Sequence, residues 1–589
     1  MRDMVRLDLN QLNLELSLRL NDIANRLRTP YTSLISELGE QNLENADWWV
    51  SVTSSRNTFA TPLFINLCHL VLIDECLREG SPIEEIVVYS RAMKKVLASV
   101  SIVKSRQIKI IYSKGFKDRL IDFVRPYYNF LDTCRVLAVE AWWARMTKKL
   151  AKNDEQAPLI VLETFVLDKS FTTYDYLERF YSQIFEFLDE DDKKRVCFLA
   201  TPYKVEKHKA LFTNLRTAKH NFLVREDYLR LRHYIYALLH PLRMHKISAA
   251  ATKFMDFDIE PMIREDLRIG ICSYTTIDSL LKYKQFEGFK DKGIRIDTYI
   301  DWLENQIIDH GINLGLRENY PTTRVIGYQG YVGPKHYLCI YPSSIEKKAG
   351  VTPDIIAVIG QGFRDNPREF CPEQEVITSP AFRFRHLWQE RKYHPEPECV
   401  TILVALPITI KEGNEIIGLL AQLLPDLGAR ANYRIWIKPH PTNQPQEIKK
   451  AFRGPWPEKF EFVAGDFYEC VEKADVLISN TSGACFETVA KGIPVILIGS
   501  TNGLTHNPIP EEVDRSIWNI CFTESELKEA IERFTQDDAD FAIKCQQIGR
   551  TIRAVYFEPV NAMAVKSFLG LPMGGESKGK RVSGEGVLE

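Results

Sequence analysis

The amino-acid sequence predicts an α/β protein with two parallel sheets, each flanked by helices. Its 589 residues exceed the roughly 150 typical of one domain, so two or more domains are expected. Hydrophobic residues make up 45% and charged residues 26% of the chain, which is the balance of a folded globular protein. Strand-like runs alternate with helical segments in two series that meet near residue 395, a pattern typical of two Rossmann-like halves.

The first series follows a helical pattern over residues 10–43. Its strand-like runs are Trp48–Thr53, Glu85–Tyr89, Ile108–Tyr112, Leu159–Phe165, Val196–Ala200, Arg324–Tyr328 and Ile355–Ile359. The second series has the runs Val400–Leu406, Tyr433–Ile437, Glu461–Val463, Val476–Ser479 and Pro494–Ile498. We therefore expect an N-terminal unit with helical additions at residues 1–395, a C-terminal unit at 396–572, and a disordered Gly/Ser-rich tail at 573–589.

Charge and cysteine usage narrow the possible partners and compartments. The formal net charge is −2, so no global field favours nucleic acid as a partner. The twelve cysteines are scattered without a Cys-x-x-Cys pair, which predicts reduced thiols in a cytoplasmic protein. The most apolar stretch, Pro62–Leu77, is shorter than the about 20 residues that a membrane-spanning helix needs.

A basic block over residues 201–246 differs from the rest of the chain. It contains ten Lys and Arg residues against three acidic ones, interleaved with aromatic residues such as Phe222, Tyr228, Tyr234 and Tyr236. This mixture predicts an interfacial segment that holds the protein peripherally on an anionic membrane surface, at the inner face of the cytoplasmic membrane. A solvated helical face explains the pattern equally well. Residues 123–146 form a second candidate interfacial helix, for which core packing is the alternative.

The stretch Ile435-Trp-Ile-Lys-Pro-His-Pro441 places Lys438 and His440 at the carboxyl end of a predicted strand. Ligands bind at this end in open α/β sheets. A His held between two prolines, together with a Lys, can bind a phosphate and neutralise the charge that develops on it. The motif therefore predicts a phosphate contact, whereas a simple turn is the alternative.

A strand, a polar turn and a helix follow in the stretch from Ala474 to Ile496. Hydroxyl and N–H groups at such a turn favour a phosphate. The residues that supply them are Ser479, Asn480, Thr481, Ser482 and Gly483. Glu487, in the helix, is positioned either to contact a ribose hydroxyl or to solvate the helix surface. Helix capping alone would need only one Ser or Thr.

These two motifs resemble those of bacterial GT-B glycosyltransferases. That group includes sialyltransferases, polysialyltransferases, Kdo transferases and the glycerophosphate polymerases of teichoic-acid synthesis, in which a His-Pro motif and a Ser/Thr motif of the C-terminal domain bind the donor nucleotide's phosphate. The resemblance implies a GT-B fold, with two Rossmann-like domains facing a central cleft. It also implies that His440 and Ser482, or its neighbour Thr481, are phosphate ligands here.

A second resemblance lies upstream. Trp302-Leu-Glu-Asn-Gln306 and Arg324-Val-Ile-Gly-Tyr-Gln-Gly330 look like the Glu-Asn-Gln and Gly-Tyr-Gln-His patterns of surface-carbohydrate biosynthesis proteins. Gln329 is therefore a candidate donor or acceptor contact. The chain departs from the pattern at Gly330, where a His is common, so the role of that His is absent or supplied elsewhere. Together the matches cover roughly residues 300–500.

The resemblance implies an inverting glycosyltransferase of bacterial capsule or O-antigen synthesis that uses a nucleotide-activated sugar. A CMP-linked acidic sugar of the Kdo or sialic-acid type is the leading donor, and the acceptor is a glycan or lipid-linked glycan. Two alternatives stay open at this point. One is glycerophosphate transfer from CDP-glycerol, and the other is a non-catalytic nucleotide- or carbohydrate-binding subunit of an export complex.

Inverting transfer needs a base for the acceptor hydroxyl, and the candidates lie in the N-terminal unit. Glu304, expected on a helix, ranks first, Glu163 at the end of an apolar run second, and Asp168 third. Arg56 and Asn57 follow a predicted strand and are candidate contacts to the donor or acceptor. For Asn57, helix capping is equally plausible.

We expect no required metal or other cofactor. The nearest candidate for an Asp-x-Asp metal loop, Asp189-Glu-Asp-Asp192, follows a helix and precedes basic residues, which indicates a charged turn.

Overall fold

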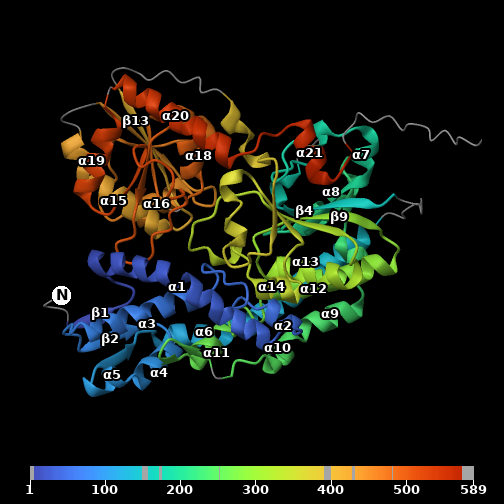
Figure 1. Ribbon diagram of the computed structural model, residues 1–589, viewed down its shortest axis with the longest axis horizontal. Helices are drawn as coiled ribbons and strands as arrows, with labels where there is room; N and C mark the ends of the chain where they lie inside the picture. The colour runs from blue at the N-terminus through green and yellow to red at the C-terminus, as the bar shows by residue number, and fades with distance from the viewer. Residues whose placement is uncertain are drawn as a thin grey trace, which may run out of the picture.

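The computed structural model describes residues 5–148, 157–171, 176–250, 252–389, 399–427, 432–480, 482–536 and 538–572. The predicted tail lies outside these residues. Figure 1 shows a six-stranded sheet with its helices at the upper left, a seven-stranded sheet at the right, and the N-terminal helices along the bottom. The predicted fold class, α/β with two Rossmann-like sheets, is confirmed.

The seven-stranded sheet is parallel throughout, in the order β12-β11-β10-β9-β4-β5-β6. Its strands are β4 (Leu159–Val166), β5 (Val196–Pro202), β6 (Phe222–Leu223), β9 (Ile296–Trp302), β10 (Arg324–Gln329), β11 (Ile355–Val358) and β12 (Glu375–Thr378). In chain order, β5 and β6 are added on one side of β4, and β10, β11 and β12 are then added on the far side of β9. The crevice between β4 and β9 is therefore the topological switch point at which ligands bind in such sheets.

Helices cover both faces of this sheet. On one face, Phe286 and Phe289 of α12 (Tyr274–Asp291) and Ile312 and Leu316 of α13 (Ile307–Asn319) pack on β4, β5 and β9. The other face carries α8 (His208–Thr217) and the 3-10 helix η2 (Ile184–Phe187). Because water reaches neither face, β4 is an almost continuous apolar run that only Glu163 and Thr164 interrupt.

The six-stranded sheet is also parallel, in the order β15-β14-β13-β16-β17-β18. Its strands are β13 (Val400–Ala405), β14 (Tyr433–Lys438), β15 (Phe460–Phe462), β16 (Val476–Ser479), β17 (Val495–Ile498) and β18 (Trp518–Cys521). This order has the same reversal, here between β13 and β16. The helices around it are α15 (Ile410–Leu427), α16 (Pro445–Ala451), α17 (Phe467–Glu472), α18 (Ala484–Ala490), α19 (Glu524–Phe534) and α20 (Ala539–Tyr556).

A third, three-stranded parallel sheet belongs to the N-terminal helical layer. Its strands are β1 (Arg6–Asp8), β2 (Glu85–Val88) and β3 (Lys109–Tyr112). The surrounding elements are α1 (Leu14–Gln41), α2 (Ala46–Trp49), α3 (Leu63–Arg78), α4 (Arg91–Ser99), α5 (Ser101–Ser105), α11 (Glu260–Asp266) and the antiparallel pair β7 (Lys253–Phe254) and β8 (Phe257–Asp258). Below the seven-stranded sheet lie α6 (Phe116–Met146), α9 (Leu231–Leu238), α10 (His240–Arg243) and α14 (Ser344–Ala349).

The end of the chain returns to the seven-stranded sheet. The backbone of Glu558 donates a hydrogen bond to the carbonyl of Ile359, and Phe568 of α21 (Ala562–Leu569) packs on Tyr328 with ring centroids 5.3 Å apart. The predicted unit boundary near residue 395 stays a prediction. The helix α21, which lies beyond that boundary in sequence, packs against the N-terminal sheet.

One predicted strand is wrong and one central strand went unpredicted. Residues 48–53 form the end of α2 and a run of turns, because Asn45 caps the helix by accepting a bond from the Asp47 backbone. The unpredicted strand is β9, in which Asp297 and Asp301 interrupt the apolar pattern; Asp301 is nevertheless fully buried.

Candidate functional site

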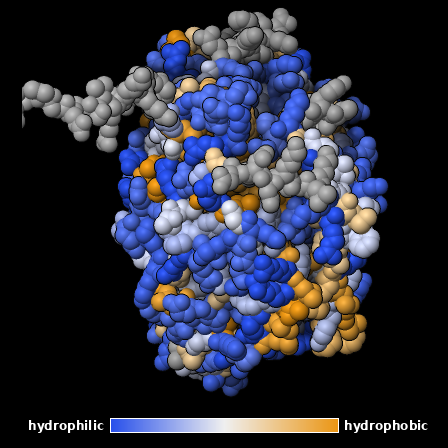
Figure 2. Space-filling view, turned by 90° about the vertical axis from the view of Figure 1, so that its right-hand side faces the viewer, coloured by the Kyte–Doolittle hydropathy of each residue, from blue (hydrophilic) through white to orange (hydrophobic). Residues whose placement is uncertain are grey.

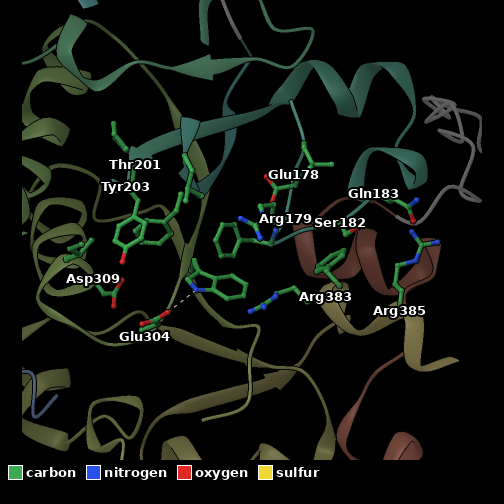
Figure 3. A pocket seen from close by; sticks show the side chains of 18 of the residues that line it. Glu178, Arg179, Ser182, Gln183, Thr201, Tyr203, Glu304, Asp309, Arg383 and Arg385 are labelled. Atoms are coloured by element: carbon green, nitrogen blue, oxygen red, sulfur yellow. Dashed lines mark hydrogen bonds between the residues drawn. The ribbon is translucent and has the colours of Figure 1, made fainter. Parts of the chain in front are cut away.

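A cavity of about 1530 Å³ opens at the carboxyl ends of β4, β5 and β9, at the switch point of the seven-stranded sheet. Phe165, Thr201 and Trp302 line it from those strands, and Tyr468 of α17 lines it from the C-terminal side. Figure 3 shows acidic, basic and aromatic side chains converging on this space. The cavity is the place where both halves of the chain can contact one ligand.

Glu304 lies on the wall of this cavity, in the loop between β9 and α13. The expected helix is wrong here, because α13 begins only at Ile307. Three donors hold the carboxylate: the Trp302 indole at 3.4 Å, the Gln306 amide at 2.5 Å and the Tyr337 hydroxyl at 3.2 Å. The carboxylate also borders a smaller cavity of about 210 Å³. A fixed, half-buried carboxylate with access to both cavities suits a proton acceptor.

Asn57 fixes the orientation of this network. Its amide nitrogen donates to Gln306 Oε1 at 3.1 Å, so Gln306 presents its own amide nitrogen to Glu304. Arg56 is 1% exposed and pairs with Glu346 at 2.6 Å, away from the cavity lining. Both residues, expected as ligand contacts, therefore support the loop that carries Glu304.

Gly330 and Gln329 show why the chain departs from the Gly-Tyr-Gln-His pattern. A Cβ atom at position 330 would lie 2.4 Å from both the Trp302 ring and the Tyr328 ring, so no side chain fits there. Gln329 is buried and donates to the carbonyl of Ile340 at 2.8 Å. The Trp302 indole fills this space and donates its N–H to Glu304.

Glu163 lies beneath the cavity in a buried cluster of charges. It accepts bonds from Lys282 at 2.7 Å and from Thr201, a cavity-lining residue, at 2.8 Å. Carboxylate oxygens of Glu163, Asp301 and Asp309 lie within 4.8 Å of one another, close enough to share a metal ion. Lys282 already supplies a positive charge to this cluster.

Burial sets the protonation of these acids. It raises the pKa of Asp301 and of Asp309 well above the usual range, and the neighbouring carboxyl groups add to the shift. Although burial acts in the same direction on Glu163, the Lys282 ammonium lowers the pKa of that carboxyl. Lys282 thus favours the ionised form of Glu163, whereas burial favours the protonated forms of Asp301 and Asp309. Asp168, the third base candidate, instead accepts bonds from the backbone of Glu206 and Lys207.

On the C-terminal side, β14 ends at Lys438 and presents His440 in the following loop. Lys438 Nζ donates to the carbonyl of Gly465 at 2.5 Å. The Thr442 backbone N–H donates to His440 Nδ1 at 3.3 Å, and partial burial lowers the pKa of the imidazole, with Lys204 adding to the effect. A neutral His440 with Nδ1 as acceptor carries its proton on Nε2, where it can donate to a ligand.

The turn between β16 and α18 lies at the switch point of the six-stranded sheet. Ser479 is fully buried and donates to the carbonyl of Ala405 on β13, so it ties the two strands together. Asn480 donates to Glu412 at 3.2 Å, and Ser482 accepts a bond from the Ala484 backbone. Ser482 is partly exposed. Thr481 lies outside the described residues.

Gly483 and Glu487 connect this turn to the other half of the chain. A Cβ atom at Gly483 would lie 3.3 Å from the carbonyl of Val332, which lines the smaller cavity together with Glu304. Glu487 Oε2 lies 3.2 Å from Nε2 of His386, a residue that lines the large cavity. The Ser/Thr turn therefore lies against residues that line the two cavities bordered by Glu304, whereas Lys438 and His440 line neither cavity.

At least five of the ten cations of the basic block form ion pairs, four of them with acids outside the block. The ion pairs join Arg216 to Asp227, Arg225 to Asp278, Arg230 to Asp291, Arg232 to Glu287 and Arg243 to Asp47. The aromatic residues that we expected at a membrane surface instead pack against buried clusters: Phe222, Tyr228, Tyr234 and Tyr236. Counting acids within the block alone therefore overestimated its free charge.

Exposed apolar residues are most numerous on α6, although the basic block also exposes Leu231, Ile235, Leu239 and Leu242. None of the side chains from residue 116 to 125 is buried, although all are described. Exposed large hydrophobic residues of α6 are Phe116, Leu120, Ile121, Phe123, Val124, Tyr127, Tyr128, Leu131, Trp142 and Met146. Figure 1 places α6 in the lower part of the molecule, and Figure 2 shows hydrophobic side chains at the lower right of the face it views. Among the described residues, no helix has the length and apolar character to span a bilayer.

Comparison with known proteins identifies similar folds only. No protein-family model matches the sequence, and no curated protein is detectably similar to it. Among solved structures, S. aureus MnaA with UDP is 11% identical, with a TM-score of 0.42 over 70% of this chain and 98% of that chain.

Two further structures show comparable similarity. The wall teichoic acid polymerase TagF, solved with CDPG, is 11% identical, with a TM-score of 0.37 over 76% of this chain and 96% of that one. The trehalose 6-phosphate synthase from Burkholderia multivorans is 10% identical, with a TM-score of 0.38 over 71% and 96%.

Several site residues escaped the sequence analysis. Tyr337, Lys204, His386 and Tyr468 reach the site from segments distant in sequence, so no local motif marks them. Gln306 was visible as part of the Glu-Asn-Gln motif, but its role depends on Asn57, which lies 249 residues away.

The raised pKa of Asp301 predicts a specific dependence of stability on pH. An acid whose pKa is raised on folding stabilises the native state fully below its unfolded pKa, about 3.9 for Asp, and this contribution is lost as pH rises through the folded pKa. Asp301→Asn removes the titrating group. Relative to wild type, its melting temperature should therefore rise as the pH is increased from 5 to 8.

The control is Asp297→Asn, on the exposed part of the same strand. Its melting temperature should follow that of wild type at every pH. If the difference in melting temperature between Asp301→Asn and wild type is the same at pH 5 and at pH 8, Asp301 is ionised in the native protein over this range.

Proposed function

We propose that this chain is an inverting, metal-independent glycosyltransferase that moves a sugar from a nucleotide donor to a glycan or lipid-linked acceptor in bacterial surface polysaccharide synthesis. One observation carries the proposal. Glu304 is held by three donors at the switch point of one Rossmann-like sheet, and it borders a cavity whose lining residue Val332 lies against Gly483 in the Ser/Thr turn of the other.

The residues divide between leaving-group binding and proton transfer. His440 donates from Nε2 to the departing phosphate, and Ser482 with the adjacent turn supplies further donors. Glu304 accepts the proton of the acceptor hydroxyl. The acceptor oxygen forms its bond to the anomeric carbon as the bond from that carbon to the phosphate oxygen breaks, which inverts the anomeric configuration.

A CMP-linked acidic sugar of the Kdo or sialic-acid type is the leading donor. With CDP-glycerol the same residues would act on a different bond, because the acceptor oxygen would then attack phosphorus. A nucleotide-binding subunit of an export complex would bind CMP or CDP without turnover. Calorimetric titration with CMP, CDP and UDP, followed by donor hydrolysis assays, separates these three outcomes.

Replacing the base tests the proton-transfer role. Glu304→Gln keeps the size and the hydrogen bonding of the side chain but cannot accept the proton, so kcat should fall by about 10²- to 10⁴-fold while nucleotide affinity is retained. Glu190→Gln, which changes an exposed carboxylate outside both cavities, is the control and should retain turnover. Normal turnover in Glu304→Gln would show that Glu304 is not the base and would leave Glu163 and Asp168 as the candidates.

Replacing His440 tests the leaving-group contact. His440→Ala should lower kcat for donor hydrolysis by about 10²- to 10³-fold, as the loss of one electrostatic donor does, and Ser482→Ala should have a smaller effect because neighbouring N–H groups remain. The control is His245→Ala, which changes an exposed histidine in the N-terminal half of the chain. An unchanged kcat in His440→Ala would remove this loop from the mechanism.

The acceptor side of the proposal includes reversible membrane contact, and α6 supplies the surface for it. Its exposed apolar residues are accompanied by Lys117 and Arg119, which have no carboxylate partner among the described residues. Cations beside an exposed apolar helix face complement an anionic lipid surface. We therefore assign the peripheral contact with the inner leaflet to α6 rather than to residues 201–246.

Vesicle flotation tests this contact. The full chain should float with anionic vesicles more than with neutral ones, and recovery should decrease as salt is raised. Phe123→Glu should lower partitioning by about tenfold or more, because it removes one large exposed apolar side chain that would enter the lipid surface. Ile543→Glu, at an exposed apolar position on α20, should leave it unchanged. Absence of flotation would contradict the proposal, and a wild-type dimer dissociated by Phe123→Glu would show that a second copy covers α6.

A further inference from the structure

Two arginine side chains extend into the large cavity without a counter-charge. In Figure 3, Arg179 and Arg383 both extend toward the middle of the cavity, whereas Arg385 extends toward Gln183. Neither Arg179 nor Arg383 has a carboxylate within ion-pairing distance among the described residues, while Arg385 lies 3.7 Å from Glu186. Within the described part of the chain, two guanidinium groups of this cavity therefore have no ion-pair partner.

The nearest acid in sequence, Glu178, does not neutralise Arg179. Its carboxylate accepts bonds from the backbone of Phe180 at 2.5 Å and of Tyr181 at 2.9 Å, and from Thr164 at 3.2 Å. Glu178 thus fixes the loop from which Arg179 projects. Placing like charges together in a partly enclosed space favours the binding of an anion.

Trp302 connects this positive region to the candidate base. The Arg383 guanidinium lies over the Trp302 ring, 5.7 Å from its centroid, and the indole N–H of the same residue donates to Glu304. Phe180 packs against the ring with centroids 4.4 Å apart. The Arg383 guanidinium and the Glu304 carboxylate therefore both lie against Trp302, so one sugar or polyol unit placed over this ring could carry an anion at Arg383 and a hydroxyl at Glu304.

We propose that Arg179 and Arg383 bind an acidic group, a phosphate or a carboxylate, on the unit of the acceptor that lies over Trp302. The acceptor is then an acidic saccharide or a polyol phosphate rather than a neutral glycan. A planar guanidinium pairs with either anion through two parallel hydrogen bonds, which also orients the unit so that its hydroxyl faces Glu304. The identification of this ligand as the acceptor rests on the proposed glycosyl transfer, whereas the anion site itself does not.

Calorimetric titration of the full chain tests the site directly. The probes are glycerol 3-phosphate and glucuronate, with glycerol and glucose as their neutral counterparts. At least one anion should bind, and each neutral probe should bind at least tenfold more weakly than its anionic counterpart. Preference for glycerol 3-phosphate or for glucuronate then distinguishes a phosphate from a carboxylate.

Variants locate the binding. Arg383→Ala and Arg179→Ala should each weaken binding of the anion by about 10- to 100-fold, the effect of losing hydrogen bonds to a charged group. Arg383→Lys should recover part of the loss, and Arg385→Ala, which removes the paired arginine, should have no effect. CMP and CDP affinity should stay unchanged in all four variants.

The outcomes separate this inference from the proposed function. Equal anion affinity in wild type, Arg179→Ala and Arg383→Ala, or no anion binding at millimolar concentration, overturns the site. Loss of anion binding in these variants together with normal turnover in Glu304→Gln would keep the anion site but reject Glu304 as the base.

Discussion

A buried ion pair between Arg56 and Glu346 holds together the segments that surround Glu304. Both side chains are 1% exposed, and the charged atoms lie 2.6 Å apart. Removing two charges from water costs several kcal/mol per ion, so such a pair persists only where further hydrogen bonds satisfy it. The Glu346 carboxylate accepts these from the backbone and hydroxyl of Ser343 and from the amide of Asn305. Although burial favours its neutral form, Arg56 lowers the pKa of Glu346 and keeps it ionised.

This constraint determines where the candidate base lies. Asn305 adopts a left-handed backbone conformation with φ of 52°, which a non-glycine residue keeps only when its surroundings hold it there. Its amide donates to the carbonyl of Cys339 and to Glu346, and that anchoring turns the two neighbouring side chains toward each other. Gln306 then bonds Glu304 and is itself oriented by Asn57. The proton acceptor is thus fixed by contacts from the N-terminal helical layer, from β9 and from the loop after β10.

The two sheets could be predicted from the sequence because parallel strands covered on both faces are apolar runs between amphipathic helices. This pattern is local and can be recognised without knowing the tertiary structure. It missed β9 because Asp301, which is fully buried and has a raised pKa, looks like a surface residue in sequence. The residues of the C-terminal motifs were visible because they are contiguous. The supporting roles of Arg56 and Asn57, and the free charge of Arg179 and Arg383, were not visible. Those properties depend on partners hundreds of residues away, or on the absence of a partner, and no local pattern encodes either.

The central claim is that the two switch points form one site, with the nucleotide on the C-terminal sheet. Hydrogen–deuterium exchange of the full chain, with and without CMP, CDP or UDP, tests it most directly. The account predicts that one nucleotide slows exchange at residues 438–443 and 482–487, with a smaller effect at the loop that carries Glu304. Protection confined to the three-stranded sheet, or none with any of the three nucleotides, would contradict it.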